Sequence, residues 1–108
     1  MIAFRIQVFG RVQGVFYRAS TKAKADALGL VGWVQNEPDG SVLMEIQGNT
    51  QQVEQMIAWC QTGPTHARVE KVETIQISVK DLADFEIRRW NSFCICRAYS
   101  LILILIFT

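Results

Sequence analysis

The stretch GRVQGVFYR, residues 10–18, joins two segments whose patterns predict different secondary structure. Before it, Ile2, Phe4, Ile6 and Val8 alternate with the residues between them. An apolar residue at every second position is typical of a half-buried strand. The chain therefore enters this stretch at the end of a predicted strand.

After the stretch, residues 19–28 predict a helix. We expect Ala23, Ala27 and Leu28 to form its apolar side. Gly29 should end it, because glycine readily takes the left-handed conformation that closes many helices. Residues 10–18 are then a loop between the end of a strand and the start of a helix.

This loop has the composition of an anion site. Gly10 and Gly14 permit backbone angles that other residues avoid, so successive N–H groups can turn inward. The helix that follows adds unpaired N–H groups and the positive end of its dipole, and Arg18 adds a guanidinium suited to an oxyanion. The loop thus predicts a phosphate pocket, although a glycine-rich turn taken alone more often marks only a tight connection. The G-x-x-x-x-G-K-[ST] spacing of the common nucleotide-binding loop is missing.

Residues 10–18 resemble, at every defined position, the acylphosphatase signature G-R-V-Q-G-V-x-[FY]-R. A second motif of that family, GWVQN, appears at residues 32–36, and DGSV follows at residues 39–42. The resemblance covers about residues 2–89. It implies a metal-free hydrolase that needs no cofactor and splits the carboxyl-phosphate bond of small acyl phosphates.

The rest of the chain continues the alternation of strand and helix patterns. Residues 30–37 and 41–47 predict a hairpin around a Pro-Asp-Gly turn, and residues 49–60 predict a helix with Val53, Met56, Ile57 and Cys60 on one stripe. A strand is expected over residues 68–80, with a bulge between Val72 and Ile75, and a short last strand over residues 85–88.

This order, βαββαβ with a short extra edge strand, predicts an α+β fold of the ferredoxin-like kind, a sandwich in which two helices cover one face of an antiparallel sheet. The resemblance implies the same fold, with strand order 4-1-3-2. In a right-handed βαβ unit, the loop leaving the first strand and the end of the second lie at one edge of the sheet. We therefore expect Arg18 and Asn36 to face a common pocket.

The resemblance assigns Arg18 to binding the phosphoryl group and Asn36 to positioning the attacking water. Without the loop, an asparagine before Pro-Asp-Gly would be taken as a turn residue only. Thr21 matches a family hydroxyl position that supports the loop or Asn36, and an ordinary role in the first helical turn is an equal alternative. The backbone donors expected around the phosphate are those of Gln13, Gly14, Val15, Phe16 and Tyr17.

Length and composition narrow the class of protein. The 108 residues are enough for one domain, and the net charge of +1 argues against a nucleic-acid binder. The single histidine and three cysteines, without metal-site spacing, predict no metal centre. With no leader pattern at the start, we expect a cytoplasmic monomer that is not membrane-bound and whose thiols are reduced. Its expected product is inorganic phosphate. We expect Cys60 to be a core residue and His66 a surface residue.

Two features depart from this simple picture. Glu37 follows Asn36, and a carboxylate near a phosphate would repel it, but strand alternation should turn the Glu37 side chain away. Residues 1–90 form the acylphosphatase-like domain, whereas residues 91–108 are an apolar extension that is too short for a membrane helix. For this extension an accidental addition is favoured, then a partner contact; an extra strand is the third alternative.

Two other functions remain open from the residues. The same loop would also suit a non-catalytic module that binds a phosphate metabolite. A single-stranded RNA binder on the open sheet face is a weaker alternative, because the charge is near neutral and no aromatic stacking run is present.

Overall fold

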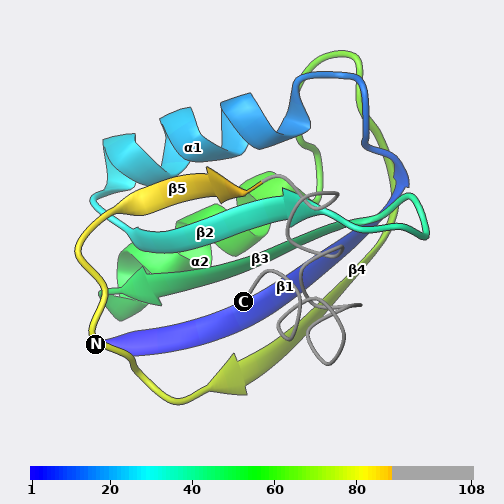
Figure 1. Cartoon of the computed structure of the whole chain (residues 1–108). Coiled ribbons are helices and arrows are strands. Elements are labelled where there is room, and N and C mark those ends of the chain that lie inside the picture. The colour runs from blue at the N-terminus through cyan, green and yellow to red at the C-terminus, as the bar shows by residue number, and fades with distance from the viewer. Residues whose placement is uncertain (89–108) are drawn as a thin grey trace, which may run out of the picture.

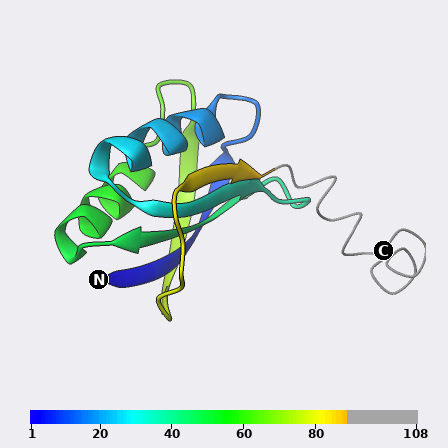
Figure 2. The ribbon, with the colours of Figure 1, turned by 60° about the vertical axis from the view of Figure 1, so that its left-hand side comes forward.

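The computed structural model describes residues 1–88, which form a five-stranded sheet with both helices on one of its faces (Figures 1 and 2). The strand order is β4-β1-β3-β2-β5. The predicted ferredoxin-like fold and its extra edge strand are therefore confirmed. The elements are β1 (Ile2–Arg11), α1 (Tyr17–Leu28), β2 (Val31–Asn36), β3 (Val42–Gly48), α2 (Thr50–Cys60), β4 (Arg68–Ile77) and β5 (Phe85–Arg88).

Strand pairing brings distant parts of the chain together. The interior strand β1 pairs antiparallel with β3 on one side and with β4 on the other (Figure 1). Strand β2 pairs antiparallel with β3, and its outer edge is covered by β5, which runs parallel to it. Since β5 runs beside β2, the last described residues lie next to the end of the hairpin strand that carries Asn36.

The core lies between the sheet and the two helices. Ile6, Met44 and Val34 stand side by side on β1, β3 and β2, and each is fully buried. From α2, the predicted stripe contributes Val53, Met56 and Cys60 to the same cluster, with Ile57 partly buried against it. Burial raises the pKa of the Cys60 thiol to about 12, so this cysteine is an inert core residue, as predicted.

The apolar face predicted for α1 is wrong at Ala23 and Ala27, and Leu28 alone of the three packs against the core. The helix begins at Tyr17, two residues earlier than expected, and its buried residues are Tyr17, Thr21 and Ala25, whereas Ala23 and Ala27 are exposed. Tyr17 fixes this rotation, because its fully buried hydroxyl donates to the carbonyl oxygen of Cys60 at 3.1 Å. Burying the large tyrosine side chain therefore decides which face of the helix is buried, and the small alanine side chains do not.

The predicted bulge also lies elsewhere. Pairing of β4 with β1 is continuous from Val72 to Ile77, and the register shifts instead at Phe9 and Gly10, which face Lys71 and Val69. Gly10 allows this close approach, because a Cβ there would lie 2.2 Å from the carbonyl oxygen of Arg68. The strand also ends at Ile77 rather than at residue 80.

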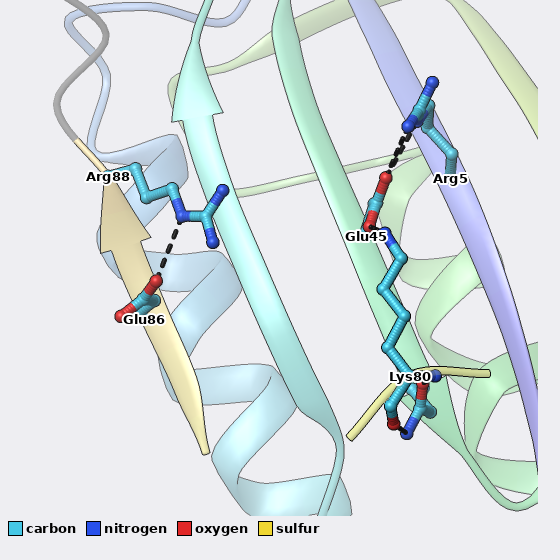
Figure 3. Close-up of polar contacts among 6 residues, drawn as sticks. Arg5, Glu45, Lys80, Glu86 and Arg88 are labelled. Carbon is cyan, nitrogen blue, oxygen red and sulfur yellow. Dashed lines mark hydrogen bonds and ion pairs between the residues drawn. The ribbon is translucent and has the colours of Figure 1, made fainter. Parts of the chain in front are cut away.

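A buried carboxylate lies on the sheet face away from the helices (Figure 3). Glu45 on β3 is 3% exposed and accepts hydrogen bonds from Arg5 at 2.6 and 2.9 Å and from Lys80 at 2.7 Å. Burial alone would raise the pKa of Glu45, but the bonds from Lys80 and Arg5 outweigh it and hold the pKa below its usual value. The backbone of Lys80 also pairs with the Gln47 side chain, which fixes the β4–β5 connection to the sheet.

The apolar extension, residues 91–108, falls outside the described residues. Within residues 1–88, neither helix combines the length and the apolar character needed to cross a lipid bilayer.

Candidate functional site

A pocket of about 410 Å³ opens where the loop of residues 10–18 meets the ends of β2 and β5. It brings together Arg18 and Asn36, as the topology predicted. Ile87 of β5 also contributes, although no sequence pattern had marked it as a site residue. The residues around the pocket are Val12, Gly14, Phe16, Tyr17, Arg18, Ala19, Asn36 and Ile87.

The loop turns into α1 through two left-handed residues. Gly14 has φ 75°, and Phe16, directly before the helix, has φ 63° and ψ 25°. The first helical residue whose N–H reaches a carbonyl is Ser20, which donates to Phe16 at 3.0 Å. The N–H groups of Tyr17, Arg18 and Ala19 therefore have no acceptor among residues 1–88, and such N-terminal donors are suited to an anion.

Arg18 lies on the first turn of α1, with its side chain half-buried in the pocket wall. One guanidinium nitrogen donates to the carbonyl oxygen of Arg88 at 3.3 Å, a long bond. In the part of the chain that the structure describes, Arg18 has no carboxylate partner. Most of the donors of this permanently charged group thus remain available for a ligand.

Asn36 ends β2 on the side of the sheet that the helices cover, paired with the core residue Val42. Its Oδ1 atom is buried and has no hydrogen-bond partner among the described residues. An unpaired buried amide oxygen is costly, and a water molecule that donated to it would remove that cost. The family resemblance assigned the attacking water to this residue, and that role stays a prediction.

The Gln13 side chain makes contacts that the sequence did not indicate. Its Nε2 atom donates to the carbonyl oxygens of Glu37 at 2.8 Å and of Ser41 at 2.9 Å. These bonds tie the loop to the turn between β2 and β3, directly after Asn36. Neither Gln13 nor Val15 lines the pocket, and the Val15 side chain is buried in the core, so a phosphate-binding role for their backbone N–H groups stays a prediction.

The β2–β3 turn is itself held in place. Asp39 accepts from the Ser41 hydroxyl at 2.6 Å and from the Ser41 N–H at 2.9 Å, and these bonds lower the pKa of Asp39. The Ser41 hydroxyl also accepts from Gln7 of β1 at 2.9 Å. Gln13 therefore contacts a turn that is already fixed to the sheet.

Glu37 points away from the pocket, as strand alternation predicted. Its carboxylate accepts a hydrogen bond from the Gln35 side chain at 2.5 Å, and residues two apart along a strand share a face. Asn36 therefore uses the opposite face. Glu37 contributes no side chain to the pocket wall.

Thr21 is fully buried beneath α1 and does not line the pocket. Its hydroxyl has no hydrogen-bond partner among residues 1–88, so a supporting role toward Asn36 or the loop stays a prediction. Trp33 is nearly buried on the opposite sheet face, where the Arg88 guanidinium lies 4.6 Å from its ring centre. His66 is exposed in the loop before β4 and is not part of the pocket.

Comparisons with known proteins cover nearly all of the described residues. The acylphosphatase family model matches residues 4–87, which include the loop, Asn36 and Ile87. An acylphosphatase of Acaryochloris marina is 46% identical over 89 residues, covering 82% of this chain and 96% of the relative. One from Rubrobacter xylanophilus is 52% identical over 69 residues, 64% of this chain and 63% of the relative.

A solved structure gives the same result. The acylphosphatase from Coxiella burnetii superposes with a TM-score of 0.79 at 37% identity, covering 81% of this chain and 92% of that one. Fold, motif positions and family match thus coincide over the described residues. The chain belongs to the acylphosphatase family.

Proposed function

We propose that this protein hydrolyses small acyl phosphates to a carboxylate and inorganic phosphate. One observation carries the proposal: a single pocket combines Arg18, the open start of α1 and the unpaired amide oxygen of Asn36. The names of the relatives, all acylphosphatases, support the same activity.

In this proposal, Arg18 and the loop hold the phosphoryl group. The guanidinium and the N–H groups at the start of α1 surround its oxygens, and the helix dipole adds favourable charge. The N–H groups of residues 13–17 complete this cradle. Such fixed donors stabilise the negative charge that the phosphoryl oxygens carry in the transition state.

Asn36 orients the water. Its amide oxygen accepts a water proton, so a lone pair of the water faces phosphorus. The water oxygen bonds to phosphorus while the bond to the bridging oxygen breaks, and the carboxylate leaves with the electron pair. The water proton passes to a phosphate oxygen of the substrate.

The reaction needs no further catalytic group. A carboxylate is a good leaving group, so positioning and charge stabilisation can supply the rate without a protein nucleophile. We therefore propose activity that persists in the presence of a metal chelator.

The test is steady-state hydrolysis of benzoyl phosphate with a chelator present, for the wild type, Arg18→Ala and Asn36→Ala. Loss of a preorganised donor costs about 3 kcal/mol, so each variant should lose on the order of 100-fold in kcat. Lys24→Ala, which removes a charge further along α1, and Asn49→Ala, whose side chain makes no cap bond, are matched controls that should stay within about threefold.

Circular dichroism and thermal unfolding establish that each variant is folded. A folded wild type without turnover, but with phosphate protecting against unfolding in an Arg18-dependent way, would support the binding-module alternative. Full activity in both site variants would refute the assigned roles.

We also propose that the protein acts as a monomer in the cytoplasm. Support comes from a pocket built by one chain and from the free thiol of Cys60. Sedimentation velocity at assay concentration tests the first point, and fractionation of the source cells tests the second.

A further inference from the structure

Two exposed apolar side chains line the pocket. Phe16, at the start of α1, is 78% exposed, and Ile87, on the edge strand β5, is 39% exposed. Single exposed apolar residues are ordinary on a protein surface. Here, however, two such residues from distant parts of the chain line the same pocket as Arg18 and Asn36.

The backbone holds Phe16 in this exposed place at a cost. Its φ of 63° lies in the left-handed region, which an aromatic residue rarely occupies. The ring gains little burial in the fold to offset that cost. Phe16 also occupies the single open position of the nine-residue signature, so the phosphate-binding pattern itself does not require a phenylalanine there.

The reaction geometry places the acyl group near these side chains. In phosphoryl transfer, the attacking and leaving oxygens lie roughly in line on opposite sides of phosphorus. With water at Asn36 and the phosphoryl group at Arg18, the leaving carboxylate points away from Asn36. Phe16 and Ile87, which line this pocket together with Arg18, are exposed apolar side chains that the acyl group can contact there.

The charges at the pocket favour the same substrates. Among the described residues that line it, Arg18 is the one with a charged side chain, and the phosphoryl group engages it. A second carboxylate on the acyl group would find no partner there, whereas an apolar acyl group would cover Phe16 and Ile87 and remove their surface from water.

We propose that Phe16 and Ile87 form an acyl-binding rim that selects acyl phosphates with bulky apolar acyl groups. This inference rests on the proposed hydrolase function and names the substrate class of that site.

The experiment compares kcat/KM for cyclohexanecarbonyl phosphate and acetyl phosphate. The two carboxylate leaving groups have similar basicity, so their ratio reports contact with the acyl group rather than intrinsic reactivity. We expect the wild type to have the higher kcat/KM for the bulky substrate. Phe16→Ala should lower the ratio of the two kcat/KM values about tenfold, because it removes an apolar contact with the acyl group at an open pocket. Ile87→Ala should lower it about threefold.

Ile75→Ala is the matched control, because Ile75 is 61% exposed on β4 and does not line the pocket. Its ratio should equal that of the wild type. Equal ratios in all four proteins, or equal losses on both substrates in the rim variants, would overturn the inference while leaving the hydrolase function in place. Absence of turnover on both substrates in the folded wild type would instead refute the function, and the rim with it.

Discussion

Two arginines in this protein are used in opposite ways. Arg5 is bound to a buried carboxylate that Lys80 also contacts, so every charge in that cluster has a partner (Figure 3). Arg18 has one long bond to a backbone carbonyl, beside helix N–H groups without acceptors and an asparagine oxygen without a donor. Paired polar groups such as those around Arg5 stabilise the fold, whereas those of Arg18, Asn36 and the start of α1 are left open in a pocket where a ligand can pair with them.

The largest expected effect separates the two arginines. Arg18→Ala should abolish activity by about 100-fold or more and change the free energy of unfolding by less than about 0.5 kcal/mol, because its single bond is weak. Arg5→Ala should do the reverse, costing about 1–2 kcal/mol of stability through Glu45 and leaving kcat/KM within about threefold. Urea unfolding and steady-state kinetics measure both quantities. If both variants lost activity, or both lost stability, the contrast between the two arginines would be wrong.

The next effect concerns the link between the loop and the turn. Gln13→Glu would place a carboxylate against the carbonyl oxygens of Glu37 and Ser41, which now accept from its amide. We expect the loop to shift from the turn, with about a tenfold loss in kcat/KM and weaker inhibition by inorganic phosphate. Gln76→Glu, on the exposed edge strand β4, adds the same charge and should change neither. Unchanged phosphate inhibition in Gln13→Glu would show that this link does not position the site.

The smallest effect depends on pH. The lowered pKa of Glu45 contributes stability above its ordinary value of 4.5, and this contribution is lost as the pH falls through the folded-state pKa. Lys80→Met removes one cause of that lowering. It should cost about 1 kcal/mol at pH 7, a value kept small because Lys80 is 51% exposed, and less at pH 3.

Urea unfolding at the two pH values measures this change. Glu86→Ala is the control, since it breaks a pair with Arg88 in which both side chains contact solvent (Figure 3). That variant should change stability by less than about 0.5 kcal/mol at either pH. A loss from Lys80→Met that grows toward pH 3 would contradict the assigned role of Glu45.

Much of the fold and the meeting of Arg18 with Asn36 could be predicted, because both depend on local signals. Glycines, helix ends and alternation mark where each element stops, and the right-handed crossover then places both residues at one edge. The same alternation also predicted that the Glu37 side chain points away from the face that Asn36 uses.

What could not be predicted depends on tertiary contacts. The hydrogen bond from Tyr17 to Cys60 sets which face of α1 is buried, so the alanine pattern gave the wrong positions for that face. The bulge near Gly10 depends on how closely the backbone of Arg68 approaches. The side-chain bonds of Gln13 and the position of Ile87 beside the pocket both join segments far apart in sequence, and no local pattern reports such neighbours.

The position of β5 has a consequence for the order in which the protein is made and becomes active. The strand supplies Ile87 to the pocket and the backbone oxygen that Arg18 contacts, and it follows β4 in the chain and pairs with the distant β2. Pairings between such distant segments form slowly, because long loops must close first. During synthesis, the loop and Asn36 leave the ribosome early, yet the catalytic pocket is completed only when residues 85–88 dock. We therefore expect a nascent chain to gain its activity late, because β5 is the last of the described strands to be synthesised.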